Sequence, residues 1–495
     1  MKRFFSLLFS LLCALILLPQ LALAHVGSKD VFEEATVGPY KLFVTIRTPT
    51  VIPGVATVEV RSTGAAISGL SITPLPLTGE ASKHPPAADA MKPSTDDPAF
   101  FTGSVWMMAA GSWQIRFDID GVSGHEAASV PVPAVALATL KMDRNLGLPL
   151  AALGLFLVLS MAGVVASAVR EASLRPGVPA SPSLRRRGWI ALAGSLVVMA
   201  VMVYLGAKWW NVAAAEYADD IYSPMATQVT LNGNQLDFIV KPYDLRNVER
   251  SNKDFLLDHG HLMHLYAIRE PEMDAVFHLH PTLLDHGDFR LDLPAMPPGN
   301  YKLYGDVVHA SGFPETLVSS MTVPAGMPAS KPGLDDAAGS AAPVSAGELG
   351  TSFRLPDGYS MVWDRPAALT ANTAYAFRFN LLTHDGKAPT DMQPYMGMKG
   401  HAAFVKTDGT VFAHVHPEGS AAMAAVMLAN PLPMDTMPEM QGMEGMSHPP
   451  GYAADPNANI VEFPYGFPSA GRYRIFVQMK HGPTVETGIF DIEVK

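Results

Sequence analysis

The chain has 495 residues, with 35 Lys and Arg against 46 Asp and Glu, so its formal net charge is −11. This acidic balance, with a pI near 5.8, argues against nucleic-acid binding. Its single cysteine, Cys13, excludes a framework of disulfides and a metal site built from thiolates. Any bound metal must therefore be held by His, Met, carboxylates or the terminal amine.

Residues 1–24 have the three parts of a secretory signal peptide. A basic Lys2-Arg3 pair precedes an apolar run, and Ala22-Leu-Ala24 supplies a small-residue cleavage site. Cleavage there would leave His25 as the mature N-terminus. A terminal histidine can bind a metal through both its amine and its imidazole, and His125 is the best partner for it.

Residues 25–140 are expected to form a first extracytoplasmic β-sandwich. Three segments alternate apolar and polar residues, as half-buried strands do, and Pro and Gly punctuate the sequence between them. These segments are Tyr40–Arg47, Val55–Arg61 and Trp113–Asp120.

Two uncharged apolar stretches, residues 146–169 and 188–207, are each long enough to cross a bilayer. The loop between them, residues 170–187, carries five Arg and one Glu, so the positive-inside rule places it in the cytoplasm. Both flanking regions would then face outward, in agreement with the signal peptide. The alternative, two buried helices of a soluble domain, leaves the Arg-rich loop unexplained. We therefore predict a hairpin of two transmembrane helices in a bacterial inner membrane.

The rest of the chain is expected to hold two divergent copies of one β module, which we call repeat 1 (residues 225–324) and repeat 2 (residues 348–495). A short tether, residues 213–223, precedes repeat 1. Residues 325–347 are rich in Ala, Gly, Ser and Pro and are expected to form a linker.

Matching strands support the duplication. Tyr301–His309 in repeat 1 matches Tyr473–His481 in repeat 2, and a further alternating strand follows each of them. His309 and His481, which end the matching segments, are candidate fourth ligands of a metal site, although exposed histidines at strand ends would give the same pattern.

Repeat 2 contains a histidine hairpin that can be folded from its sequence. Asp408-Gly409 is a strong signal for a two-residue turn, and apolar-rich runs flank it. With this turn, Ala403 lies opposite His414 and His401 lies opposite His416. Side chains two apart on a strand share a face, so His401, His414 and His416 should point the same way.

Repeat 1 carries the same pattern, with His264 followed by His278-Leu-His280-Pro281. Its loop is one residue longer, and a turn near Glu272 again sets His264 opposite His280. We therefore predict two metal sites, each made of three imidazoles from one hairpin. The alternative is that these histidines are polar positions on two solvated hairpins.

Repeat 2 also contains a segment with methionine at every third position. In an extended chain of three residues per turn, these thioethers would line one side. Soft sulfur suits Cu(I), whereas Zn²⁺ prefers imidazole, thiolate or carboxylate. The alternative is a flexible Met-rich loop or gap-filling core, but the neighbouring residues are mostly small or polar. The ladder, which we interpret as a Cu(I)-capturing loop, consists of Met434, Met437, Met440, Met443, Met446 and the following His448.

Individual modules resemble known families, although no single family covers the chain. The segment Gly111–Gly121 makes the first module similar to YtkA-like and FixH-like extracytoplasmic β-domains. A mature His25 resembles the CopC family of periplasmic copper carriers, but the Asp-Gly-His stretch expected there is replaced by Asp120-Gly-Val-Ser-Gly-His125. The repeats look like domains of bacterial membrane proteins associated with heavy-metal handling. The methionine ladder is similar to those of periplasmic copper oxidases and copper chaperones. These resemblances imply copper handling.

The predicted fold is mainly β, with three extracytoplasmic β-sandwich modules, immunoglobulin-like or cupredoxin-like, and a two-helix transmembrane hairpin. The predicted function is to hold or transfer copper, as Cu(I) or Cu(II), in resistance, homeostasis or cuproenzyme assembly; zinc also fits three imidazoles. Expected partners are the inner membrane and a copper exporter, oxidase or cuproenzyme. The alternative is an immunoglobulin-like scaffold that binds a partner without metal. We predict no enzyme, because no Ser/His/Asp order, HExxH motif or blue-copper cysteine occurs.

Overall fold

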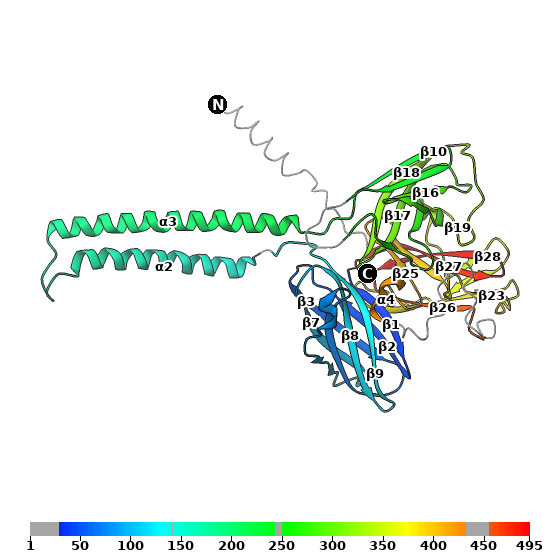
Figure 1. The fold of residues 1–495 in the computed structure, drawn as a ribbon, viewed down its shortest axis with the longest axis horizontal. Helices are drawn as coiled ribbons and strands as arrows, with labels where there is room; N and C mark the ends of the chain where they lie inside the picture. Colours follow the sequence, from blue (N-terminus) through cyan, green and yellow to red (C-terminus); the bar gives the residue numbers. More distant parts are fainter. Residues whose placement is uncertain (1–28, 141, 243–249, 432–454) are drawn as a thin grey trace. The chain divides into compact units, whose positions relative to one another are not determined.

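The computed structural model describes residues 29–140, 142–242, 250–431 and 455–495. The fold is mainly β, as predicted, and two long helices interrupt the β structure (Figure 1). By its contacts the chain divides into two units, of which one contains the helix pair, residues 135–222, and the other contains all the sheets.

The first module is built from two antiparallel sheets, in the orders β1-β2-β3-β7-β6 and β5-β4-β8-β9. The three strands predicted from alternation lie in β2, β3 and β8, so that prediction is confirmed. Apolar residues of these strands such as Leu42 and Ile115 are fully buried. The strands are β1 (Val31–Val37), β2 (Tyr40–Arg47), β3 (Gly54–Ser62), β4 (Ile67–Pro76), β5 (Asp89–Ala90), β6 (Lys92–Pro93), β7 (Phe100–Met107), β8 (Gly111–Gly121) and β9 (Gly124–Ala134), and a short 3₁₀ turn, η1 (Glu80–Lys83), follows β4.

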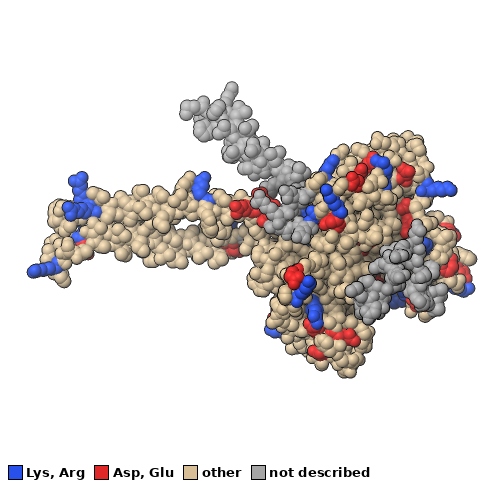
Figure 2. All heavy atoms as spheres, in the orientation of Figure 1, with Lys and Arg blue, Asp and Glu red and all other residues tan. Residues whose placement is uncertain are grey.

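Two helices, α2 (Arg144–Glu171) and α3 (Pro182–Asp219), are long and apolar enough to cross a membrane. Their apolar side chains are exposed, with Phe156 at 64% and Trp209 at 71%, as expected of surfaces that face lipid. Figure 2 shows basic side chains gathered at the end of the pair where the helices connect.

Helix α3 is longer than the apolar stretch that predicted it. It begins at Pro182 because the Ser181 side chain accepts a hydrogen bond from the Leu184 amide and Pro is favoured in the first turn. Three arginines of the predicted loop therefore lie in its first turns. At the other end the helix continues to Asp219, so most of the predicted tether is helical; its Ala-Ala-Ala-Glu sequence favours that state.

Repeat 1 consists of two sheets, one in the order β10-β11-β16-β15 and one in the order β12-β17-β13-β14-β19, with β18 paired to β17. Their facing sides bury an apolar core that includes Phe238, Leu265 and Leu303. The strands are β10 (Thr227–Asn232), β11 (Gln235–Val240), β12 (Phe255–Leu256), β13 (His264–Glu270), β14 (Ala275–Leu279), β15 (Thr282–Asp285), β16 (Asp288–Asp292), β17 (Gly299–His309), β18 (Pro314–Val323) and β19 (Ala337–Ser340).

Repeat 2 has the matching topology: one sheet has the order β20-β21-β22-β26, and the other has the order β23-β27-β24-β25, with β28 paired to β27. Strand β24 thus occupies the place of β13, and β27 that of β17, as the duplication requires. The elements are β20 (Ser352–Arg354), β21 (Ser360–Trp363), β22 (Tyr375–Leu382), β23 (Met392–Gln393), β24 (His401–Lys406), β25 (Phe412–Val415), α4 (Met423–Ala429), β26 (Ile460–Tyr465), β27 (Gly471–His481) and β28 (Thr484–Val494), with η2 (Val344–Ala346) before them.

The predicted linker, residues 325–347, is not only a connection. Its strand β19 pairs with β14 and so extends the sheet of repeat 1. The composition of residues 325–347 predicted a linker, but small residues also suit a strand when its partner strand and the neighbouring sheet leave little room for side chains. Gly339 illustrates this, since an added Cβ would lie 2.7 Å from the Thr487 side chain of repeat 2.

The histidine-bearing sheets of the two repeats pack against each other. Tyr266 and Tyr304 from repeat 1 share one buried apolar cluster with Ala403 and Phe412 from repeat 2. The rings of Tyr304 and Phe412 stack with centroids 4.3 Å apart. This packing places the two histidine hairpins in one buried interface instead of on two solvated surfaces.

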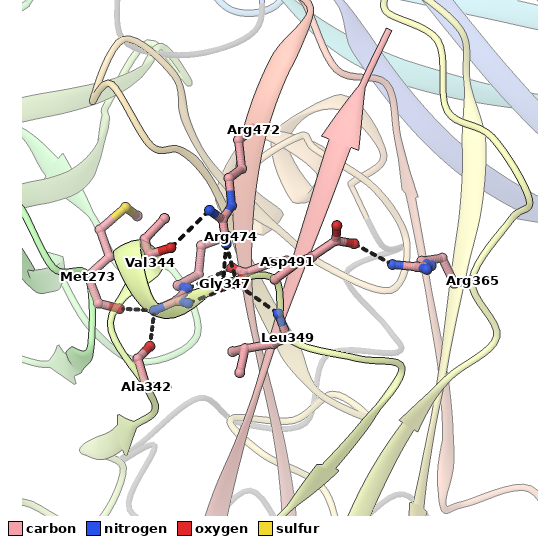
Figure 3. Close-up of polar contacts among 10 residues, drawn as sticks. Met273, Ala342, Val344, Gly347, Leu349, Arg365, Arg472, Arg474 and Asp491 are labelled. Atoms are coloured by element: carbon pink, nitrogen blue, oxygen red, sulfur yellow. Dashed lines mark hydrogen bonds and ion pairs between the residues drawn. The ribbon is translucent and has the colours of Figure 1, made fainter.

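A buried arginine of repeat 2, paired with an aspartate of the same repeat, also joins the repeats (Figure 3). The guanidinium of Arg474 in β27 donates two hydrogen bonds to the Asp491 carboxylate, at 2.7 and 2.9 Å. Its remaining nitrogen donates to the carbonyls of Met273, in the β13–β14 turn, at 2.8 Å and of Ala342, beyond β19, at 2.9 Å. Both charged side chains are fully buried.

Candidate metal centre

The hairpin register predicted for repeat 2 is confirmed. Ala403 pairs with His414 and Val405 pairs with Phe412 across β24 and β25, and Gly409 has the positive φ of 71° that the turn needs. In repeat 1, Tyr266 pairs with His278 and Leu265 with Leu279, which is the register expected there.

The two predicted sites form one cluster, which we call the histidine centre. Across the interface, the ring of His414 lies 5.3 Å from that of His264 and 5.5 Å from that of His278, between centroids. The two predicted sites therefore adjoin, because the sheets that carry the hairpins face each other. The centre consists of His259, His261, His264, His278, His280, His401, His414 and His416.

Two groups of three histidines have candidate donor atoms that all lie within 4.8 Å of one another. The first group, His264, His278 and His280, is the one predicted for repeat 1. In the second, His259 from repeat 1 joins His401 and His416 of repeat 2, whereas His414 belongs to neither group. We call these groups triad 1 and triad 2.

His259 was missed because its own repeat supplies no hairpin partner for it. It lies in a tight turn before β13, where His259 has a φ of 50° and Gly260 a φ of 87°. Repeat 2 has the same turn at Met396 and Gly397, with φ of 50° and 83°. The two turns meet, since the Nδ1–H of His259 donates to the Met396 carbonyl at 3.1 Å. The His-Gly-His sequence of residues 259–261 was the available signal.

Hydrogen-bond acceptors around the centre determine which ring nitrogen of each histidine is protonated and how the ring is oriented. The Nε2–H of His264 donates to the Asp258 carbonyl at 2.9 Å, and the Nδ1–H of His416 donates to the Ala421 carbonyl at 3.4 Å. The Asp336 carboxylate lies 3.1 Å from Nδ1 of His280. Metal-bound imidazoles typically donate their second N–H to a carbonyl or carboxylate in this way. The nitrogen turned toward the centre is then unprotonated and carries a lone pair.

His278 is held in the same manner, and this brings two lone pairs together. Its Nδ1 lies 2.9 Å from the Gln478 side-chain oxygen and 3.3 Å from the hydroxyl oxygen of Tyr395, which itself donates to the Asp335 carbonyl. In the tautomer of His278 that donates Nδ1–H to the Gln478 oxygen, Nε2 of His278 faces Nδ1 of His264 at 3.1 Å with neither protonated. Two nitrogens bound to one tetrahedral ion lie about 3.3 Å apart. A cation between them would replace lone-pair repulsion with two bonds.

Other inward nitrogens have no hydrogen-bond partner among the described residues. They are Nε2 of His259, His280, His414 and His416 and both nitrogens of His401. Buried polar atoms are nearly always hydrogen-bonded, and leaving one unpaired costs about 1–3 kcal/mol. One nitrogen of His401 must carry the proton of its neutral ring, and the other nitrogens of this set have lone pairs that a cation could accept.

Burial keeps seven histidines of the centre uncharged. It lowers the pKa of His259 and of His264 to about 4 and that of His416 to about 3. The pKa values of His278, His280, His401 and His414 are also lowered well below the usual range, again mainly by burial. Neutral imidazole is the form that binds metal.

Two buried carboxylates lie at the centre. Burial acts to raise the pKa of Asp258, but the nearby rings of His259, His416 and His264 outweigh it and the pKa is lowered. Burial raises the pKa of Asp306 to about 7, although a hydrogen bond from Thr316 opposes it. An Oδ2 of Asp306 lies 3.4 Å from Nδ1 of His414.

The candidate fourth ligands lie elsewhere in their repeats, each between carboxylates. The ring nitrogens of His309 lie 3.1 Å from Asp254 and 3.0 Å from Glu315. Those of His481 lie 3.3 Å from Asp391 and 3.1 Å from Asp357. Neither histidine belongs to triad 1 or triad 2.

The surroundings of His309 and His481 differ in charge. In repeat 1, Arg250 forms an ion pair with the same Glu315 that contacts His309. In repeat 2, His481 groups instead with two carboxylates, Asp357 and Glu486, which lie close enough to hold an ion with it.

The remaining candidate ligands are outside the histidine centre. His125 is exposed, and its Nδ1 lies 2.9 Å from an Asp120 carboxylate oxygen in the first module. The proposed N-terminal ligand His25, the methionine ladder of residues 434–446 and His448 lie outside the described residues.

Comparisons with known proteins identify one domain. Residues 354–495 match the family model of a domain of unknown function, DUF8832, which corresponds to repeat 2. No curated protein matches the chain.

Likenesses to solved structures are weak. A tetra-tandem repeat from the extending region of a large adhesion protein has 8% identity and a TM-score of 0.16, over 92% of this chain and 74% of that chain. An alpha-2-macroglobulin of E. coli has 10% identity and a TM-score of 0.15, over 94% and 25% of the two chains. Scores this low support no inference about function.

Proposed function

We propose that this protein is a membrane-anchored, extracytoplasmic metal-binding protein that holds or transfers copper and does no catalysis of its own. The observation that carries the proposal is the set of buried, neutral imidazoles whose lone pairs face one another without a hydrogen-bond partner. Imidazole ligands suit copper and zinc alike. Copper is favoured over zinc by the methionine ladder in the sequence of repeat 2, since thioethers bind Cu(I) and are poor ligands for Zn²⁺.

Both repeats contribute ligands to triad 2, so metal binding there requires the repeats to be packed together. A bound ion would in turn stabilise that packing, because it binds the folded arrangement and not the separated strands. Such a centre suits retention of a metal, with release coupled to loosening of the interface between the repeats.

The first prediction tests the proposal through His259. In the full-length protein purified in detergent, His259→Gln should remove about one Cu(II) equivalent, because triad 2 then keeps only two imidazoles. His384→Gln, which changes an exposed histidine away from the centre, should leave the copper content unchanged. Copper per chain is measured by elemental analysis after desalting.

An unchanged copper content in the His259 variant would contradict the assignment of triad 2. If the unaltered protein binds no copper or zinc at the centre, the metal-binding proposal fails, and a scaffold that binds a partner becomes the better reading of the fold.

The second prediction concerns orientation in the inner membrane, which is part of the proposal. The loop between α2 and α3 should face the cytoplasm, because its Arg residues lie within the reach over which basic residues set orientation. A reporter cysteine at Ser173 should be shielded from impermeant thiol reagents in intact spheroplasts, while reporters at Thr95 and Leu334 should react. Reaction at Ser173 with protection at Leu334 would place the histidine centre in the cytoplasm.

A further inference from the structure

We propose that the histidine centre binds two metal ions as one magnetically coupled pair, with His414 lying between them as a ligand available to either ion. This inference rests on the proposed metal-binding function and specifies the arrangement of the ions within it.

Each triad is complete enough to bind an ion by itself. In both, the candidate donor atoms lie within 4.8 Å of one another, and three imidazoles are a common ligand set for copper and zinc. Outer hydrogen bonds orient the rings of both triads, to the Asp258 carbonyl in triad 1 and to the Met396 and Ala421 carbonyls in triad 2. Neither triad needs a ligand from the other.

The triads are nevertheless in contact. The ring centroids of His259 and His264 lie 6.1 Å apart, and those of His278 and His401 lie 6.3 Å apart. A metal lies only about 2 Å from the imidazole nitrogen that binds it. Ions held by such neighbouring rings would therefore be close enough for their unpaired electrons to interact strongly.

His414 occupies the space between the triads. Its ring centroid is 5.3 Å from that of His264, 5.5 Å from that of His401 and 4.6 Å from that of His416. Its Nε2 is buried and has no hydrogen-bond partner among the described residues. A ring so placed can complete the coordination of either ion, and so offers a path for an ion to pass from one triad to the other.

Buried negative charge supports a second ion. Two cations in a low-dielectric interior repel each other unless charges of opposite sign lie near them. Asp258, beside His264 and His259, supplies one carboxylate, and Asp306, beside His414, supplies a second when a nearby cation favours its ionised form. These groups come from repeat 1, and together they would offset part of the charge of an ion pair.

Electron paramagnetic resonance of the full-length protein tests the pair. Cu(II) is the probe, because the methionine ladder favours Cu(I) and should not compete for it. One equivalent should give the spectrum of an isolated ion. A second should broaden this spectrum, lower the signal per copper and produce a half-field transition. His280→Gln and His416→Gln should each restore the isolated-ion spectrum, and His384→Gln should keep the coupled one.

If two equivalents of Cu(II) give two unbroadened spectra, the coupled pair is wrong and the proposed metal-binding function stands. If the protein binds no copper, both the coupled pair and the proposed function are wrong. His414→Gln should weaken binding of the second equivalent by at least tenfold and reduce the half-field signal. If that variant, shown by circular dichroism to be folded, keeps both the affinity and the coupling, His414 is a ligand of neither ion.

Discussion

Replacing Arg474 with Met is expected to lower the free energy of unfolding of the sheet-bearing unit by about 3–5 kcal/mol. The substitution leaves the Asp491 carboxylate buried without its guanidinium, and it removes the donors to the Met273 and Ala342 carbonyls. An uncompensated buried charge accounts for most of the expected loss. Chemical unfolding followed by tryptophan fluorescence measures it, since Trp363 lies in the repeat 2 core.

Arg472 supplies a matched control. It also contacts Asp491, at 3.2 Å, but its side chain is 28% exposed. Arg472→Met should therefore cost no more than about 1 kcal/mol. Replacing Asp491 with Leu in the Arg474→Met background should recover part of the loss, because the buried carboxylate is then removed and the charge that remains, on Arg472, is partly exposed. Equal, small effects of the two arginine substitutions would show that Arg474 and its buried ion pair do not stabilise the packing of the repeats.

The same substitution links the packing of the repeats to metal binding. Arg474 joins the β13–β14 turn of repeat 1 to β27 of repeat 2, and triad 2 needs ligands from both repeats. Metal affinity at triad 2 should thus fall more than at triad 1, whose three histidines come from repeat 1 alone.

The sequence predicted the local geometry of the histidines well. Alternation placed β2, β3 and β8, and the Asp408-Gly409 turn placed Ala403 opposite His414. These features depend on neighbours in sequence, because a tight turn and a two-residue period determine which side chains share a face of a hairpin. The topology shared by the repeats was likewise visible in the matching segments that became β17 and β27.

The composition of the centre could not be predicted in this way. Pairing one hairpin with another depends on tertiary packing, and the apolar residues that drive it, such as Tyr266 and Phe412, were not distinguishable from ordinary strand residues. For the same reason the prediction assigned His414 to the second site, whereas triad 2 contains His259 from repeat 1 in its place. The linker was misjudged because only the packing of both sheets shows why its small residues form β19.

Metal-free protein is expected to lose stability steeply as the pH falls from about 6.5 toward 4. The folded-state pKa values of His259 and His264 are about 4, below the value of about 6.5 for an exposed histidine. Between these values the unfolded chain binds protons that the folded protein does not, so unfolding is favoured. Above about pH 6.5 these histidines are neutral in both the folded and the unfolded chain, so protonation no longer lowers the stability.

The expected loss is large because several histidines act together. A shift of 2.5 units for one imidazole corresponds to about 3 kcal/mol by pH 4. His278, His280, His401 and His414 shift in the same direction, although mutual repulsion means that their contributions do not simply add. Asp306 acts in the opposite sense, since its pKa is raised to about 7 and its protonation favours the folded state. Burial also raises the pKa values of Glu33, Asp336, Glu418 and Glu486, which act in the same sense as Asp306, so these carboxyls offset part of the loss from the imidazoles.

Melting temperature measured from pH 8 to pH 4 on chelator-treated protein gives the test. Replacing His401 and His416 together with Gln should flatten the profile, because glutamine takes up no proton in the unfolded chain. His384→Gln should not change it, since that histidine is exposed in the folded protein. Bound metal should raise the melting temperature most at neutral pH and progressively less on acidification, as protons compete for the same nitrogens. A profile that stays level from pH 6.5 to pH 4 would mean that the histidines are not held neutral in a buried centre, and the packing of the two hairpins against each other would be wrong.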